Sequence, residues 1–445
     1  MMTSQTSTET YSGSGATARS DYLAGLLNLR QPLDTNAGWW PNELRDRATA
    51  HVRELAIPSS RDEEWRFTNL AGLLQTQFQA VDQQPLLSFA EIEPFILPEA
   101  VNSRLVFVNG IYDPALSSVS DLPDGIIVTN LATALELEAI NDGIVNLLNP
   151  LPGAEEVFTA LNTASMTDAA IVWVYNKQEI EIPIQILYVS TATQPTLVHP
   201  RCYVMAQDFS KLTLIEEFVS LNEGVYFTNS VTEIHVWPNA AVDHIRIQRE
   251  SENAFHIGKT AVSQEHDSHY ACHAVNLGGR LSRHNLEVYQ TGSQTETVMD
   301  GLTIARHEQL SDTHSILALT QPYGTSQQIH KCIVDDRAHA VFNGKIFVPK
   351  AAQQTNAEQV NRNLLLSPKA RVDTKPQLEI VADNVRCTHG ATVGQLEADE
   401  VFYLQSRGID ADTARRLLTT AFAYEIIDRI PISSLRASLG QLISP

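Results

Sequence analysis

The sequence predicts a mainly β protein: a long β-helix core flanked by α-helical regions at both ends. Beyond residue 170, strand-like segments such as AIVWVY, PIQILYVS and KLTLIEEFVS follow one another with little helical pattern between them. Helical periodicity is found mainly near the two ends of the chain. A block of roughly 200 such residues is large for a single sandwich, so stacked coils are favoured. No exact repeat is visible, and a double sandwich stays open.

The chain divides into four regions. Residues 1–20 are rich in Ser, Thr and Gly and are predicted to be disordered. Residues 21–165 form an N-terminal helical and mixed region, in which the Asn-Gly pair of RLVFVNGIYDP predicts a hairpin. Residues 166–393 form the β-helix core, and residues 394–445 are helical again.

The C-terminal region carries clear helix signals. EADEVFYLQSRG has acids in its first turn, Arg407 in its last turn and Gly408 at the position of a C-terminal cap. Asp410 can cap the next helix, which is predicted to run to Ile430 before Pro431. Its apolar stripe must be covered by the β block, and such a helical pair can also offer a groove or ridge to a partner.

Charge and cysteine content narrow the function classes. With 31 Lys and Arg against 52 Asp and Glu, the net charge of −21 disfavours nucleic acids and anionic membranes, so proteins are the expected partners. No membrane helix or signal peptide is recognisable, which predicts a cytoplasmic location, or a plastid stroma. The four cysteines are widely spaced and predict reduced thiols: Cys202, Cys272, Cys332 and Cys387.

The segment NVRCTHGATVG contains the first candidate site. In an extended strand Val385, Cys387 and His389 share one face, so a thiol and an imidazole become neighbours. Both are ligands for Zn, Fe or Cu, but two ligands complete only half of a tetrahedral site, so the others must come from elsewhere, for example from another chain. The alternative is that Val385 faces the core, with a buried cysteine and a hydrogen-bonded histidine beside it.

Other candidate groups are weaker. A histidine-rich group is interpreted mainly as a solvated or hydrogen-bonded strand face, because strand alternation divides its members between two faces. Asp335 and Asp336 are predicted turn residues, and no hydrolase or nucleotide-binding motif is present. The histidine-rich group comprises His266, His269, Cys272 and His273, with His256 and His284 nearby.

Several long segments resemble a known family. They include EEWRFTNL (63–70), LVFVNGIYDPALS (105–117), NLGGRLSRHNLEVYQTG (276–292) and the run from FNGKIFVPK to FYLQSRGI. Together they closely resemble the SufB/SufD family of iron–sulfur cluster assembly proteins. The chain resembles the SufD branch, because its first cysteine is Cys202 and it reads CTHGATVG where SufB proteins typically read C-E-H-E-A-T.

This resemblance implies a right-handed parallel β-helix, pairing with SufB, and binding of the ATPase SufC by the C-terminal helices. Cys387 and His389 match the cysteine and histidine at the SufB interface, where a nascent, transient Fe–S cluster is built with SufB ligands. No cofactor is then expected to stay bound to the isolated chain. FYLQSRGI matches the SufC-facing helical region. The contact candidates are Phe402, Tyr403, Arg407 and Gly408, for which ordinary helix packing and a C-cap are the alternative.

Two functions follow. The first is a non-catalytic scaffold subunit of a SufB–SufC–SufD complex. The second is an independent metal-dependent or Cys/His enzyme that uses Cys387 and His389. A carbohydrate-active β-helix is disfavoured by the missing export signal. A homodimer of the isolated chain is also compatible with the sequence, because a surface that adds a related partner's strands can often add its own copy.

Overall fold

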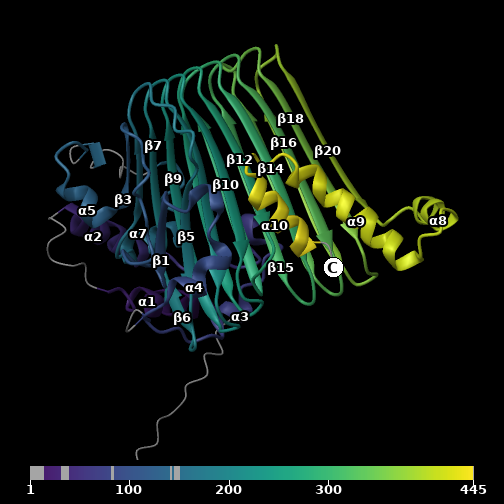
Figure 1. The fold of residues 1–445 in the computed structure, drawn as a ribbon, viewed down its shortest axis with the longest axis horizontal. Helices are drawn as coiled ribbons and strands as arrows, with labels where there is room; N and C mark the ends of the chain where they lie inside the picture. Colours follow the sequence, from purple (N-terminus) through teal and green to yellow (C-terminus); the bar gives the residue numbers. More distant parts are fainter. Residues whose placement is uncertain (1–14, 32–39, 82–84, 141–142, 145–150, 444–445) are drawn as a thin grey trace, which may run out of the picture.

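The fold is a two-sheet solenoid, seen in a computed structural model that describes residues 15–31, 40–81, 85–140, 143–144 and 151–443 (Figure 1). From β7 onward the strands alternate between the two sheets, and each pairs in parallel with the strand one coil away. The strand order is β2-β1-β5-β8-β10-β12-β14-β16-β18-β20 in sheet 1 and β19-β17-β15-β13-β11-β9-β7-β4-β3 in sheet 2, with β6 beside β9. The predicted β-helix with helical ends is confirmed.

The strands have the following bounds. Sheet 1 contains β1 Arg104–Val108, β2 Ile111–Tyr112, β5 Ile184–Ser190, β8 Lys211–Ser220, β10 Ala241–Arg249, β12 His269–Asn276, β14 Glu296–Ala305, β16 Thr325–Val334, β18 Asn356–Leu365 and β20 Arg386–Gly394. Sheet 2 contains β3 Ile126–Asn130, β4 Ala170–Val174, β6 Thr196–Val198, β7 Arg201–Ala206, β9 Tyr226–Val236, β11 Phe255–Gln264, β13 Leu281–Gln290, β15 Leu310–Leu319, β17 His339–Val348 and β19 Arg371–Ile380.

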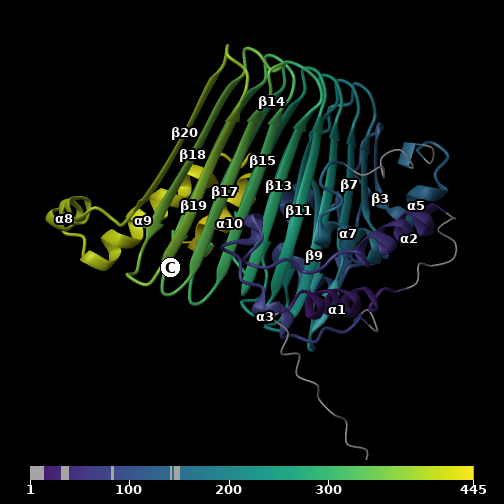
Figure 2. The same ribbon diagram turned by 180° about the vertical axis from the view of Figure 1, so that it is seen from behind.

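Most of the helices lie on the outer faces of the two sheets, whereas α8 projects beyond β20. They are α1 Ala16–Leu27, α2 Trp40–Val52, α3 Ala71–Leu74, α4 Phe89–Ile92, α5 Leu131–Glu136, α7 Val157–Ser165, α8 Ala398–Ser406, α9 Ala411–Ile427 and α10 Ser433–Ile443, with 3-10 turns η1 Glu63–Trp65, η2 Glu93–Phe95 and η3 Pro98–Ala100. Figure 2 shows α1 and α7 on the outer face of sheet 2, whereas α9 and α10 cover sheet 1.

The coils differ in length, which explains why no fixed repeat is visible in the sequence. Ser282 and Ser311 are hydrogen-bonded across neighbouring coils and are 29 residues apart, whereas Gln328 and Gln359 are 31 apart. Stacking requires only that side chains of similar size follow one another along the axis. One such column of buried aliphatic side chains is Val172, Val204, Ile234, Val262, Val288, Leu317 and Ile346.

The first end of the solenoid is closed by antiparallel pairs. β1 pairs with β2 through the predicted Asn-Gly hairpin, where Asn109 and Gly110 both have positive φ, at 50° and 82°. This is the backbone geometry that a type I′ turn requires. In sheet 2, β3 pairs antiparallel with β4. β1, β2 and β3 precede residue 166, so the sheets begin before the predicted start of the core.

Two predicted boundaries are wrong. Helix α1 begins at Ala16, so residues 16–20 are helical rather than disordered, while residues 1–14 lie outside the described residues. Helix α9 ends at Ile427 instead of Ile430. The ring of Pro431 disfavours helical geometry in the residue before it, which limits the helix there. Within the described ranges, no helix is long and apolar enough to span a membrane.

Candidate functional site

The far end of the solenoid is open. β20 pairs only with β18, and β19 pairs only with β17, so the last strand of each sheet has one edge without a strand partner in the described chain. Figure 1 shows β20 at this end, with α8 projecting beyond it. Such an edge presents backbone N–H and C=O groups to any chain that can add a strand.

Cys387 and His389 lie on this last strand. The register places Cys387 beside Ala357 and His389 beside Gln359, so both side chains continue columns that face the interior of the solenoid. Ala357 and Gln359 are buried, but no further coil covers β20, and His389 is exposed. The expected shared face is confirmed by the extended conformation of β20.

The two side chains have different surroundings. Cys387 is half-buried and, with Val385, packs against the main core, whereas His389 contacts solvent. Burial raises the pKa of the Cys387 thiol, so the thiol is protonated at neutral pH in the isolated chain. A protonated thiol is a weaker nucleophile and a weaker metal ligand than a thiolate. Binding of a metal would supply the missing driving force for deprotonation.

This pair does not make a complete metal site. In the described part of the chain, no group of three or more His, Cys, Asp or Glu side chains is arranged to hold a metal ion. The members of the histidine-rich group do not come together. Cys272 lies in the core, His273 lies 3.3 Å from Asp300 and His269 lies 3.5 Å from Glu296. Within the described residues, Cys387 and His389 therefore supply two of the four ligands that a tetrahedral site requires.

Sequence reasoning missed a polar row inside the solenoid. His244 lies in the interior with Nε2 2.9 Å from Glu216 and Nδ1 3.0 Å from the hydroxyl of Tyr270. Burial alone would lower the pKa of His244, but contacts with Cys272 and Glu216 outweigh burial and raise it to about 9. The imidazole is therefore protonated at neutral pH and forms a buried ion pair with Glu216.

The same row continues on β10 and β11. Arg246 contacts His256 at 2.5 Å, and His256 contacts Glu250 at 2.5 Å. The alternating residues of β10, Ile245 and Ile247, point outward into the cluster beneath α9 and α10. A signal was present in DHIRIQ, whose polar residues alternate with isoleucines, but the pattern alone does not say which set faces inward.

The C-terminal helices provide a second surface near the open end. On α8, Phe402 and Tyr403 are 69% and 58% exposed, while Val401 is buried. The guanidinium of Arg407 lies 5.4 Å from the centroid of the Tyr403 ring and donates a 3.4 Å hydrogen bond to its hydroxyl. Exposed aromatic side chains next to an arginine are typical of protein-binding surfaces.

Gly408 caps α8. Its φ is +89°, and its N–H donates to Gln405 O, as in a helix C-terminus. A Cβ at this position would meet no atom within 4 Å, so the requirement for glycine is conformational. We expect Gly408→Ala to destabilise the α8–α9 connection by about 1 kcal/mol, because L-residues disfavour positive φ. Thermal unfolding would measure the loss, and Gly408→Asn should recover part of it.

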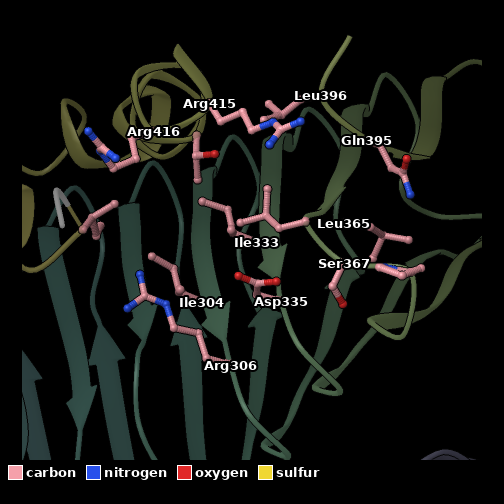
Figure 3. A pocket seen from close by; sticks show the side chains of 14 residues that line it. Ile304, Arg306, Ile333, Asp335, Leu365, Ser367, Gln395, Leu396, Arg415 and Arg416 are labelled. Carbon is pink, nitrogen blue, oxygen red and sulfur yellow. The ribbon is translucent and has the colours of Figure 1, made fainter. Parts of the chain in front are cut away.

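A cavity of about 790 Å³ lies between α9 and the ends of β14, β16 and β18 (Figure 3). Arg415 and Arg416 of α9 border it from one side, and Arg306 and Asp335 border it from the ends of the strands. The segment that leads to α8 contributes Gln395 and Leu396. The cavity therefore lies beneath the first turns of α9, whereas its last turns pack on sheet 1 through Ala423, Ile426 and Ile427.

Comparison with known proteins identifies the family. The model described as "SUF system FeS cluster assembly, SufBD core domain" matches residues 188–422, and "SufBD protein N-terminal region" matches residues 17–186. The SufBD family protein slr0076 of Synechocystis is 46% identical over 412 residues, covering 90% of both chains. SufD of Escherichia coli is 32% identical over 409 residues, covering 89% of this chain and 92% of the relative.

A plant relative has similar coverage. Protein ABCI7, chloroplastic, of Arabidopsis thaliana is 35% identical over 428 residues, which cover 92% of this chain and 88% of the relative. The two matching family models lie side by side along the sequence and include both the solenoid and most of its flanking helices. The chain therefore belongs to the SufB/SufD family of the SUF iron–sulfur cluster assembly system.

Proposed function

We propose that this chain is a non-catalytic scaffold subunit that pairs with a SufB chain through its open end and binds the ATPase SufC through its C-terminal helices. A nascent Fe–S cluster would then be assembled at the interface between the two solenoids. The observation that carries the proposal is the position of an incomplete ligand pair, Cys387 and His389, on a strand with a free edge. A related partner that adds its strands there can supply the remaining ligands.

In this proposal the cluster is a product that is passed to an acceptor and is not a permanent cofactor of the chain. His389 offers an exposed imidazole nitrogen, and Cys387 becomes a thiolate only when iron binds. Half of the coordination sphere is lost when the partners separate, so an assembled cluster can be released to an acceptor. The isolated chain would hold no permanent cofactor, and its free edge could pair two copies in the absence of SufB. We place the complex in a bacterial cytoplasm or a plastid stroma.

The attachment of α9 supports transmission of motion from the ATPase to the solenoid. Lys331 of β16 lies 2.5 Å from Glu425 and donates a 3.0 Å hydrogen bond to Phe422 O. Arg429, just beyond α9, lies 3.2 Å from Asp300 of β14. Because β16 pairs with β18, and β18 with β20, a displacement of α9 acts on strands close to the proposed interface.

Size-exclusion chromatography with purified SufB and SufC tests the proposal, and a chain that binds neither protein contradicts it. Phe402→Asp should weaken SufC binding by about tenfold, because an exposed aromatic side chain is lost from the contact. The same variant should still bind SufB. Phe209→Asp, at a 54% exposed position between β7 and β8, is the matched control and should bind both partners normally. Equal SufC affinity of the wild type and Phe402→Asp would exclude α8 from the contact.

A further inference from the structure

The proposed scaffold role does not use the segment 59–70, which contains EEWRFTNL. It crosses the outer face of sheet 2. Trp65 is buried there. The centroid of its ring lies 5.4 Å from the centroid of the Phe158 ring and 3.8 Å from the guanidinium carbon of Arg283. This stacking combines apolar burial with a cation–π contact.

A compact group of charges fastens the segment to the sheet. His314 of β15 lies between two carboxylates, with Nδ1 3.3 Å from Glu64 and Nε2 3.1 Å from Asp312. Arg283 of β13 donates hydrogen bonds to Asp312 at 2.8 Å and to Glu64 O at 2.7 Å. The hydroxyl of Thr68 also donates to Asp312. Thr68 thus contacts the buried Asp312 directly, and Glu64 is connected to it through His314 and Arg283.

The charge of this group depends on one proton. Asp312 and Glu64 supply two negative charges and Arg283 supplies one positive charge, so the group is neutral only when His314 is protonated. Burial alone would lower the pKa of His314, but Asp312 and Glu64 outweigh burial and raise it. For Asp312, burial is outweighed by His314 and Arg283, which lower its pKa to about 2.

The other titratable groups near His314 have partners of their own. These neighbouring pairs are Lys259–Glu287, Lys345–Glu379, Lys375–Glu63 and His339–Asp373, with Arg371 also on Asp373 and Glu156 capping α7. A cavity of about 260 Å³ borders both Glu64 and His314, which gives water a route to the imidazole. Most polar side chains that line this cavity are hydrogen-bonded to one another. We therefore interpret the cavity as a route for protons to His314 and not as a ligand-binding site.

We propose that Glu64, Asp312 and His314 form a pH-responsive latch that holds residues 59–70 on sheet 2 and loosens when His314 loses its proton. The latch also braces the last strand of that sheet. Glu63 lies 2.7 Å from Lys375 of β19, and Glu64 accepts from Asn343, which in turn accepts from Gln377 of β19. Opening of the segment therefore removes contacts from β19 as well.

The direction of the pH effect follows from linkage. A solvated histidine has a pKa of about 6.5, and the closed latch raises it. The stabilisation of the closed latch by protonated His314 is fully present below about pH 6.5. It is lost as the pH rises through the pKa that His314 has in the closed latch. The latch is therefore closed in mildly acidic solution and weakens in alkaline solution.

Hydrogen exchange of the full chain, read by mass spectrometry between about pH 6 and 9, tests the latch. After correction for intrinsic exchange rates, the protection of residues 59–70 should fall several-fold as the pH rises, while the protection of β11 stays constant. His314→Gln keeps hydrogen-bonding capacity but cannot be protonated, so it should show low protection of 59–70 at every pH. His339→Gln, which removes a histidine paired with Asp373 on the same sheet, should keep the wild-type profile.

The latch is overturned if wild-type protection of 59–70 does not depend on pH, or if His314→Gln has the same dependence as the wild type. If protection of β11 collapses in His314→Gln, that variant has unfolded and Glu64→Gln is compared with the wild-type series in its place. In that case Glu64→Gln provides the second comparison, because Glu64 is exposed and its loss leaves the buried Asp312–Arg283 pair intact.

Discussion

His389→Ala should assemble with SufB and SufC normally and yield about ten- to a hundredfold less Fe–S cluster, as expected for loss of an interaction that tunes a metal site. The side chain is exposed, and the substitution therefore leaves the core unchanged. The reason for the loss is that His389 supplies an accessible nitrogen ligand at the free edge of the solenoid. Anaerobic reconstitution, with visible absorption for the cluster and size-exclusion chromatography for the complex, measures both quantities.

The matched control for this variant is Thr388→Ala, on the opposite face of β20. It should give wild-type cluster yield. Unchanged cluster yield from an intact His389→Ala complex would remove this residue from the assembly site, and the contribution of the chain would then lie in its helices. Turnover by the isolated chain that disappears in His389→Ala would instead favour the enzyme hypothesis.

Ala391→Pro should weaken pairing with SufB strongly while the chain stays folded. Arg386 donates its N–H to Thr355 O, so in the parallel ladder the even-numbered residues of β20 point their backbone groups toward β18. Odd-numbered residues, including Ala391, point theirs toward the free edge. Proline there removes an edge donor and obstructs an added strand, which should cost about 3 kcal/mol, or roughly a hundredfold in Kd.

Ala391→Val is the control, because it retains the N–H and no further coil covers this position on the interior face. Its SufB affinity should stay close to that of the wild type. Circular dichroism would verify that both variants fold. Normal SufB binding by a folded Ala391→Pro chain would show that the partner does not add a strand to β20.

The sequence pattern predicts most of the secondary structure, because strand and turn signals are local. The Asn-Gly hairpin and the caps at Gly408 and Asp410 have their expected geometry. Local signals do not predict which side chains of a strand face the interior of the solenoid. Ile245 and Ile247 face outward because α9 and α10 cover them, and His244 occupies the interior because Glu216 neutralises it. Both facts depend on partners far away in the sequence.

The part of the candidate site that depends on neighbouring residues in the sequence was also predictable. Alternation along an extended strand is enough to place Cys387 beside His389, and the number of ligands is enough to call the pair incomplete. That β20 is the last strand of its sheet could not be predicted, because it depends on where the coils stop stacking. The raised pKa of the Cys387 thiol likewise depends on packing against distant strands.

The contrast between the two ends of the solenoid limits how the chain can polymerise. At its first end the sheets finish in β2, of two residues, and in β3, both of which run antiparallel to their neighbours. The parallel pairing stops at these antiparallel strands, so a parallel ladder cannot continue from this end in the same direction. Within the described residues, β19 and β20 are the end strands that run parallel to their neighbours. If two copies paired through these end strands, both free edges would be used, and we expect association to stop at a pair without growth of a fibre.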